Sequence, residues 1–479
     1  MLQVVQAYDR APITEIETDD EAALERKLQA AQAVFKDRDN WLKPHQRIAI
    51  LRKLAGLLEA RRDHFAMQIA REGGKPLPDA IVEANRAVDG VYNAAEELRN
   101  FAGREIPMGL SAAAADRWAF TTKEPIGIVA AISAFNHPLN LIVHQVAPAI
   151  AVGCPVIVKP AGTTPLSCID FVKLVHEAGL PEAWCQTFVP EETALAEKFA
   201  TDPRIAFLSF IGSAKVGWYL HSKLAHGARS ALEHGGVAPA IVDKSADLDG
   251  IIEPIVKGGY YHAGQVCVST QRIYVHDAIV NDFTERLVAR VKKLRTGDPT
   301  LKDTEVGPLI VPKEADRVAS WIDEAVKGGA RLATGGRRLS ETTLEPTVLI
   351  DPDPEARISS EEVFGPVVAI YRYSKLDDAI ARANSLPVAF QASIFAQDID
   401  VAMRAANRLD ASAVMVNDPT TFRTDWMPFA GRRVSGYGTG GIPYTMHDMT
   451  QEKMILLKRA EGLRHRAPAV IPDKPHQRR

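Results

Sequence analysis

The chain has 479 residues, of which 46% are hydrophobic and 24% are charged, and its formal net charge is −3. This length exceeds what one simple core accommodates, so the sequence predicts two or three domains of an ordinary globular protein. A charge so close to zero provides no electrostatic basis for binding nucleic acid or an anionic membrane, and we expect neither as a partner.

The four cysteines, Cys154, Cys168, Cys185 and Cys267, form neither a C-x-x-C pair nor a disulfide pattern. This spacing is typical of a reducing compartment, and we expect no metal cofactor. Residues 1–20 lack a basic region followed by an apolar core, so no secretory signal is predicted. No apolar run is long enough to span a bilayer. The predicted location is therefore the cytoplasm.

Helices are predicted for most of the first hundred residues. The stretch from Thr18 to Glu21 has the S/T-x-x-E capping pattern, which predicts a helix ending near residue 35. Pro44 is favourable in the first turn of a second helix, expected to run to about residue 71. A Gly-Gly pair then ends it, and a third helix is expected over residues 80–101.

Strands and helices alternate from residue 128 onward, after an extended, exposed segment at 112–123. Val156, Ile157 and Val158 form a continuous apolar run, as expected for a strand buried on both faces. The alternation predicts a parallel sheet with right-handed crossovers. In this half, the predicted strands are 128–132, 155–159, 184–189 and 205–210, and the predicted helices are 138–152, 165–177, 193–200 and 213–224.

A second alternating half follows Glu233. Its predicted strands are 240–242, 268–275, 392–395 and 414–417, with two more near Thr347 and Val367. Its predicted helices are 248–262, 278–294, 312–327, 376–383 and 401–408. A further exposed strand is expected at 453–457. The basic tail that follows has little to bury, and we expect it to be partly disordered.

One cysteine stands at the start of a β-branched run. A turn containing Gly264 delivers Cys267 to a predicted strand, which places a small nucleophile at the mouth of that strand. A lone cysteine in such a place is more often buried and inert. Three other segments change that interpretation, and they are Leu232-Glu233-His234-Gly235-Gly236, Ser133-Ala134-Phe135-Asn136-His137-Pro138 and Glu361-Glu362-Val363-Phe364-Gly365-Pro366.

Together the four segments resemble the aldehyde dehydrogenase superfamily, and the resemblance runs from about Tyr8 to about Leu457. It implies oxidation of an aldehyde to an acid with a nicotinamide cofactor. Cys267 matches the family's nucleophile, Asn136 its oxyanion donor, and Glu233 the base that activates water to hydrolyse a thioester. From the residues alone, Asn136 could also cap the helix that follows, and Glu233 could be a surface carboxylate.

The resemblance also implies a site for NAD or NADP. Lys159 matches the position that holds the adenine ribose, and its alternative is a solvated strand end. The Gly-Ser pair at 212–213 opens a helix whose amides can bind a pyrophosphate. NAD-specific relatives often have Glu where this chain has Gly162, and the change removes a repulsion against the 2′-phosphate of NADP. The predicted cofactor residues are Lys159, Gly162, Gly212, Ser213, Glu362 and Phe364.

A second glycine-rich stretch, residues 436–441, fits the G-x-G-x-x-G spelling. It does not follow a predicted strand inside a βαβ unit, and no helix clearly follows it. We therefore interpret it as a flexible C-terminal loop and not as a dinucleotide-binding fingerprint.

Three segments, 135–138, 422–429 and 441–444, look like those of family members that act on small polar aldehydes. Lactaldehyde, phosphonoacetaldehyde, sulfonated aldehydes and short semialdehydes are the candidate substrates. Some members with anionic substrates carry Arg immediately before the cysteine, and Val266 stands there in this chain.

Arg86, His137 and Arg423 are the candidate residues for the polar end of the substrate. An arginine fork can hold a carboxylate, phosphonate or sulfonate in two parallel hydrogen bonds. Ordinary ion pairs provide the alternative, because Arg86 follows Glu83 by three residues on a predicted helix and Arg423 lies two residues before Asp425.

The expected fold is α/β, with two doubly wound domains and a strand arm that implies a homodimer or homotetramer. The NAD(P)-binding domain is predicted at 1–111 and 125–234, and the catalytic domain at 235–445. The arm is predicted at 112–124 and 446–460, and the basic tail at 461–479. The strand pair with which family members usually begin is expected to be short or missing.

Two other functions remain open at this point. A coenzyme A-acylating enzyme shares much of the pattern, but such members generally lack the base that Glu233 matches. A catalytically silent relative, kept as a binding or structural protein, is disfavoured because Asn136, Glu233 and Cys267 are all present.

Overall fold

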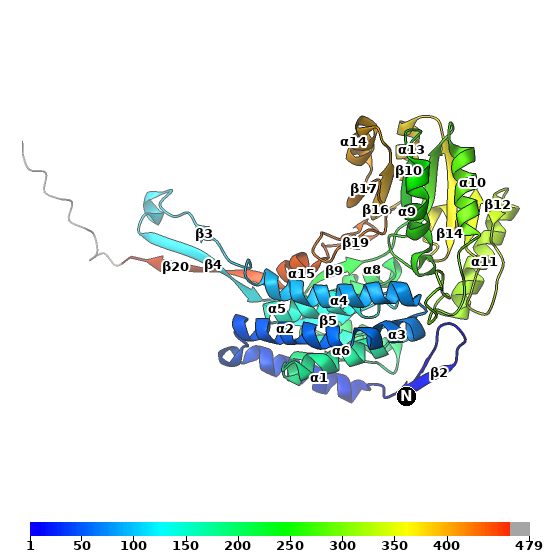
Figure 1. Cartoon of the computed structure of the whole chain (residues 1–479). Coiled ribbons are helices and arrows are strands. Elements are labelled where there is room, and N and C mark those ends of the chain that lie inside the picture. The colour runs from blue at the N-terminus through cyan, green and yellow to red at the C-terminus, as the bar shows by residue number, and fades with distance from the viewer. Residues whose placement is uncertain (460–479) are drawn as a thin grey trace, which may run out of the picture.

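The computed structural model describes residues 1–459, so the tail predicted at 461–479 lies outside the described residues. The fold is α/β, as the sequence predicts, with two sheets whose central strands are parallel. In Figure 1 the first sheet and its helices fill the lower part of the view, the second sheet stands above them on the right, and a strand arm projects to the left.

Six strands form the first sheet, and all neighbours are parallel except the first two. Their order is β19 (Gly436–Tyr437), β9 (Arg229–Glu233), β8 (Ile205–Ile211), β5 (Ile128–Ile132), β6 (Val156–Lys159) and β7 (Cys185–Thr187). The surrounding helices are α1 (Glu21–Lys36), α2 (Pro44–Ala60), α3 (Arg62–Gly73), α4 (Leu77–Glu97), α5 (Asn140–Val152), α6 (Leu166–Glu177), α7 (Thr193–Thr201) and α8 (Ala214–Ser222).

Helices cover both faces of this sheet. In β5, Val129 and Ala131 pack into the core formed with α2 to α6. Ile128 and Ala130, which point the other way, pack with α1, α7 and α8. Side chains alternate between the faces of a strand, so a strand covered on both sides must be apolar throughout. This requirement explains why β5 and β6 are continuous apolar runs.

Seven strands form the second sheet. Their order is β12 (Arg331–Thr334), β13 (Thr347–Ile350), β14 (Val367–Tyr373), β11 (Thr270–His276), β10 (Ala238–Val242), β16 (Gln391–Phe395) and β17 (Ala413–Val416). The helices on one face are α9 (Leu248–Tyr260), α10 (Val280–Val291) and α11 (Pro312–Lys327), and those on the other are α13 (Leu376–Ala383) and α14 (Ile399–Arg408). Shorter elements are α12 (Arg357–Ser360), β15 (Val388–Ala389), β18 (Arg432–Arg433) and α15 (Ile442–Asp448).

The arm consists of β20 (Thr450–Lys458), β4 (Arg117–Pro125) and β3 (Glu105–Ile106), paired antiparallel in that order. It extends away from both sheets, as Figure 1 shows. Large apolar side chains remain exposed on it: Trp118 at 53%, Met454 at 56% and Leu457 at 48%.

Three details of the N-terminal region differ from the sequence prediction or complete it. Helix α1 is capped by the side chain of Asp20, which accepts from the Ala23 amide at 2.7 Å, and not by Thr18. The single helix expected over 44–71 breaks at Arg61, whose φ of −110° and ψ of 14° end α2 before α3 begins. The initial strand pair is present but short, with β1 (Leu2–Val5) antiparallel to β2 (Pro12–Ile16).

Among residues 1–459, no helix combines the length and the apolar character needed to cross a bilayer.

Candidate active site

A cavity of about 960 Å³ lies between the two sheets and is lined by residues of both. It brings together every site residue that the sequence predicts except Gly162, which is exposed in the loop after β6. The predicted residues that line it are Arg86, Asn136, His137, Lys159, Gly212, Ser213, Glu233, Cys267, Glu362, Phe364 and Arg423.

Cys267 and Glu233 approach each other from the two sheets. Glu233 is the last residue of β9, and Cys267 lies in the loop that leads into β11. That loop makes a tight turn in which Gly264 has a φ of 72°, and a Cβ there would lie 2.1 Å from the Gly365 carbonyl oxygen. Only glycine tolerates this close approach. The turn brings Cys267 Sγ to 3.9 Å from Glu233 Oε1, close enough for the thiol to donate.

Burial dominates the protonation of this pair. It raises the pKa of the Cys267 thiol well above its usual range, and the Glu233 carboxylate adds to this effect. It also raises the pKa of Glu233, although the Arg423 charge partly opposes the shift. The pair is therefore a neutral thiol beside a carboxylate that is a better proton acceptor than an exposed one.

Asn136 lies in the loop between β5 and α5 and is buried. Its Nδ2 donates to the Gln265 carbonyl oxygen at 2.9 Å, which ties this loop to the loop that carries Cys267. The alternative role as a helix cap is wrong, because α5 begins only at Asn140. The first amides of α5 are bound from outside the helix instead: Glu83 Oε1 accepts from Leu139 N and Asn140 N at 3.0 and 3.1 Å.

The predicted cofactor residues other than Gly162 line the cavity. Lys159 is the last residue of β6, and burial lowers the pKa of its ammonium group. Ser213 lines the cavity and precedes the first turn of α8, and amides at a helix start favour anions. Phe364 has a φ of 47° and sets its ring edge-on to Phe135, with the centroids 5.8 Å apart.

Glu362 is the most unusual of these residues. Its Oε1 is buried and has no hydrogen-bond partner among the described residues. Burial raises the pKa of the carboxyl to about 8. A buried carboxyl with an unused oxygen at a cavity wall is a position for a ligand hydroxyl.

The two predicted substrate arginines have partners other than the predicted ones. Arg86 does not pair with Glu83, which instead forms a fully buried ion pair with Lys75. Arg86 binds Asp425 through Nη2 at 2.7 Å and Nε at 3.3 Å. Arg423 therefore does not take Asp425 as its partner, and its Nη1 lies 3.9 Å from Glu233 Oε1. Contacts between distant segments replace both expected local pairs.

Asp425 is a site residue that the sequence analysis missed as such. It is 2% exposed and also accepts from Asn140 Nδ2 at 3.1 Å and from His144 Nε2 at 2.7 Å. Burial opposes its ionisation, but His144 and Arg86 outweigh it and hold the pKa of the Asp425 carboxyl far below its usual range. Asn140 and His144 stand one turn apart on the mostly apolar helix α5, and that polar stripe was the available signal.

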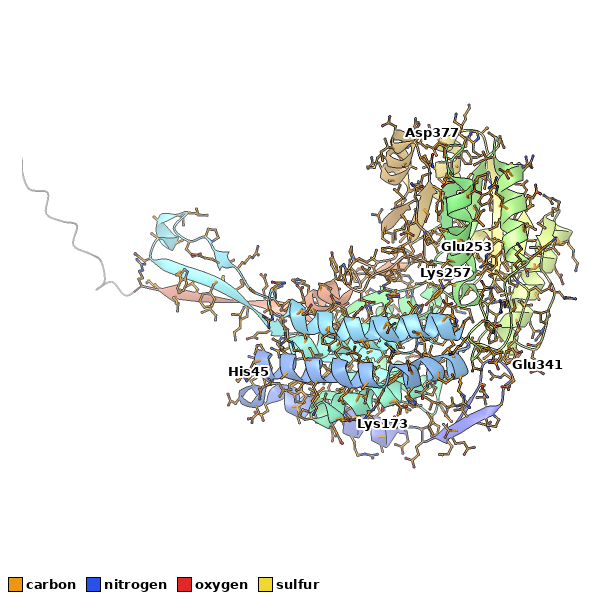
Figure 2. All side chains as sticks on the ribbon, viewed as in Figure 1. His45, Lys173, Glu253, Lys257, Glu341 and Asp377 are labelled. Carbon is orange, nitrogen blue, oxygen red and sulfur yellow. The ribbon has the colours of Figure 1, made fainter. Side chains whose placement is uncertain are left out.

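Charged residues also line the part of the cavity formed by α4 and α9. Lys257 of α9 pairs with Asp79 of α4 and lies over the Tyr261 ring, with Nζ 4.6 Å from the centroid. Figure 2 shows Lys257 at the end of α9 that faces α4. His137 lies between these elements, 6.0 Å from Tyr261 between ring centroids, and burial lowers its pKa well below the usual range. His137 therefore stays neutral near neutral pH and can offer one ring N–H.

The glycine-rich stretch at 436–441 has a structural role that the sequence analysis missed. Gly436 and Tyr437 form β19, which pairs antiparallel with β9 at Glu233 and Leu232. Helix α15 follows directly, contrary to the expectation that no helix does. The stretch therefore completes the first sheet beside Glu233 and is not a free loop.

Comparison with known proteins identifies the family. The aldehyde dehydrogenase family matches residues 1–455. A 3-sulfolactaldehyde dehydrogenase of Priestia megaterium is 36% identical over 456 residues, which are 95% of this chain and 94% of the relative. The structure of aldehyde dehydrogenase 21 from Physcomitrella patens with succinate is 35% identical and superposes with a TM-score of 0.93 over 96% of each chain. A glyceraldehyde-3-phosphate dehydrogenase of Methanocaldococcus jannaschii with NADP is 32% identical, with a TM-score of 0.91 over 96% of this chain and 99% of its own. The chain therefore belongs to the aldehyde dehydrogenase family, in which the oxidant is NAD(P).

Proposed function

We propose that this enzyme oxidises a small polar aldehyde to its carboxylate through a thioester on Cys267, which water then hydrolyses. The observation that carries the proposal is the 3.9 Å approach of Cys267 Sγ to Glu233 Oε1 inside a cavity that also contains Asn136. Nucleophile, base and amide donor then surround one point at which an aldehyde carbonyl can lie.

The first step is attack on the carbonyl carbon. The Cys267 proton leaves to solvent water as Sγ forms the bond to carbon and the carbonyl π bond breaks, so Glu233 stays unprotonated for the later step. The oxygen of the resulting thiohemiacetal gains negative charge. Asn136 Nδ2 has a second N–H beyond the one given to Gln265, and it can donate to that oxygen.

The second step releases the acid. Lys159, Ser213 and Glu362 would hold NAD(P)⁺, which would supply the hydride acceptor needed between the thiohemiacetal and the thioester. Glu233 then takes a proton from water, the hydroxide oxygen attacks the thioester carbon, and Cys267 leaves as a thiolate. A carboxylate beside the sulfur suits this hydrolysis and disfavours the coenzyme A-acylating alternative.

Lys159, Ser213 and Glu362 form the part of the cavity lining that we call the cofactor wall. These residues fit a dinucleotide. Glu362 offers the buried, unpartnered oxygen that a ribose hydroxyl needs. The amides at the start of α8 can donate to a pyrophosphate, and Lys159 lies at the end of β6 in the same sheet. Gly162 provides no carboxylate near that lysine, which supports use of NADP alongside NAD.

We propose an anionic head group for the substrate. Arg86 and Arg423 both line the cavity, and among the described residues the carboxylates paired with them are Asp425 and Glu233. Arginine is the side chain best suited to a planar or tetrahedral oxyanion. Two relatives agree with this chemistry: one is named for a sulfonated aldehyde, and one holds succinate. Carboxylated, sulfonated and phosphonated aldehydes are therefore the candidates.

We further propose a cytoplasmic homodimer or homotetramer. Its support is the exposed apolar arm, together with the edge position of β17 in the second sheet, where a strand from another copy can pair. The four free cysteines agree with a reducing compartment.

The test separates hydride transfer from hydrolysis. Glu233→Gln retains the thiol and should give a rapid burst of NAD(P)H that stops near one equivalent, followed by slow acid release. Cys267→Ala is the matched control and should give no burst. Full steady-state turnover by Glu233→Gln would refute the hydrolytic role of Glu233, and a burst from Cys267→Ala would refute the covalent mechanism.

A further inference from the structure

Arg423 is buried without the hydrogen bonds that a guanidinium group normally makes. Its side chain is only 10% exposed. Its Nε has no hydrogen-bond partner among the described residues. Its Nη2 reaches His144 Nδ1 at a long 3.4 Å, and its Nη1 approaches Glu233 Oε1 only to 3.9 Å. A planar fork with five N–H donors is therefore largely unused inside the cavity.

Its position, by contrast, is well defined. The Arg423 Cζ lies 3.5 Å from the centroid of the Phe429 ring, so the guanidinium plane rests on an aromatic face. Phe429 is itself buried against Phe390, with ring centroids 4.6 Å apart. The donors are thus held in place and still free to bind an anion in the cavity.

The same guanidinium lies beside the catalytic pair. Glu233 Oε1 lies 3.9 Å from Arg423 Nη1 and 3.9 Å from Cys267 Sγ. Glu233 is 15% exposed, so water screens these charges only weakly. Whatever else binds Arg423 will change the electrostatic environment of Glu233.

Arg86 provides the contrast within the same cavity. Two hydrogen bonds tie it to Asp425, a carboxylate that also accepts from Asn140 and His144. This arrangement leaves Arg86 as a fixed counter-charge for a ligand, with no contact to Glu233. An anion that binds Arg423 would therefore change the surroundings of Glu233, whereas an anion that binds Arg86 would not.

We propose that Arg423 is shared between Glu233 and the anionic head of the substrate, so that binding of the anion to Arg423 increases the basicity of Glu233 for thioester hydrolysis. The inference rests on the proposed function above. It adds a positioning and coupling role: Arg423 links the charge at one end of the substrate to the proton affinity of the base at the other end.

The charges around Glu233 determine the sign of this coupling. Cys267 faces it from the loop before β11, and Arg423 from the loop after β17. Arg86 of α4, His144 of α5 and Asp425 interact electrostatically with Arg423, and Glu362 does so with Cys267. The Arg423 charge lowers the pKa of Glu233, against the larger effect of burial. An anion paired with Arg423 cancels that charge, so the pKa of Glu233 rises.

The experiment compares two aldehydes of similar length, succinic semialdehyde and the neutral 4-hydroxybutanal. The acyl-enzyme is formed in a single turnover with saturating cofactor, and the rate constant for acid release is measured by rapid quench as a function of pH. Hydrolysis requires unprotonated Glu233, so each profile falls on its acidic side at the pKa of Glu233 in that acyl-enzyme.

The acidic limb is the part of the profile where the rate constant for acid release falls with falling pH. We expect its midpoint for the anionic substrate to lie about one pH unit above that for the neutral one, roughly a tenfold change in the proton affinity of Glu233. In Arg423→Gln, both substrates should give the same midpoint, at or above the wild-type midpoint for the anionic substrate. Arg423→Lys should restore part of the separation, because it restores the charge. Arg86→Gln is the matched control, and it should raise KM for the anionic aldehyde while the limbs stay separate.

Coinciding limbs in the wild-type enzyme would overturn the inference, and that comparison needs no variant to fold. Limbs that remain separate in Arg423→Gln would overturn it as well. The burst of NAD(P)H recorded in the same experiment reports aldehyde oxidation itself. Its absence would refute the proposed function, whereas a normal burst with coinciding limbs would refute only the coupling.

Discussion

A Cβ atom on Gly235 would lie 1.7 Å from Oε1 of Glu362, so this glycine makes room for the carboxylate of a residue more than a hundred positions later. Gly235 has no positive φ, and its small size rather than its flexibility is therefore what the site uses. Gly235 follows β9 of the first sheet, and Glu362 precedes β14 of the second, so their close contact joins the two sheets at the cavity.

Gly235→Ala should consequently weaken cofactor binding. The methyl group displaces the carboxylate end of Glu362, which is the flexible partner, and removes the oxygen proposed to bind a ribose hydroxyl of the cofactor. We expect KM for NAD(P) to rise at least tenfold, about 1.4 kcal/mol, with smaller change in KM for the aldehyde. In the Glu362→Ala background the same change should have little further effect, because the clash is gone. Additive losses in the double variant would contradict this explanation.

Cofactor choice is predicted to depend on Gly162. A Cβ on Gly162 would meet no atom within 4 Å, so a larger side chain fits without strain. Gly162→Glu should introduce a carboxylate near Lys159 and repel the 2′-phosphate of NADP. We expect kcat/KM with NADP to fall by about tenfold or more, while the value with NAD changes little. Gly162→Gln controls for size, and an equal loss with both cofactors would contradict the charge argument.

The buried pair of Lys75 and Glu83 should be important for stability. Both side chains are 0% exposed, and Glu83 also accepts the first amides of α5, the helix that follows Asn136. Lys75→Met removes the cation and leaves a buried carboxylate, which typically costs about 3–5 kcal/mol. We expect a clearly lower midpoint in thermal unfolding, and the addition of Glu83→Gln should recover part of it. An unchanged midpoint for Lys75→Met would show that the pair is dispensable.

Assembly should depend on the arm. Trp118 and Leu457 face each other across the pairing of β4 and β20, and both are about half exposed. Replacing both with Glu places two like charges on the surface proposed to bind another copy, so we expect dissociation in analytical ultracentrifugation. Thr122→Glu and Lys453→Glu, at a polar pair of the same two strands, provide a control for the arm's own pairing. A wild-type chain that sediments as a monomer would refute the proposed role.

The fold was predictable because its dominant signals are local. Continuous apolar runs such as Val156 to Val158 can only be strands covered on both faces, and the helices between them follow from their spacing. The break at Arg61 was not predictable, since neither glycine nor proline marks it. The capping role of Asn136 was a plausible local alternative, but Glu83 occupies the start of that helix from a distant segment.

The candidate site was predictable only as a set of residues. The motifs named Cys267, Glu233 and Asn136, and the structure places all three on one cavity. The partners of Arg86 and Arg423 were not predictable, because the local pairs with Glu83 and Asp425 look sufficient in the sequence. The actual partners depend on how segments more than a hundred residues apart meet, and local spacing carries no information about that.

The pairing of β19 with β9 has a consequence for how the enzyme is made. Strand β9 ends at Glu233, but its outer neighbour is contributed by Gly436 and Tyr437, some two hundred residues later. Arg423 and Phe429 come equally late. A nascent chain emerging from the ribosome can therefore build most of both sheets while one wall of the catalytic cavity is still unsynthesised. Arg423 and Phe429 can close that wall only after they have been added to the chain, so we expect no activity before that point.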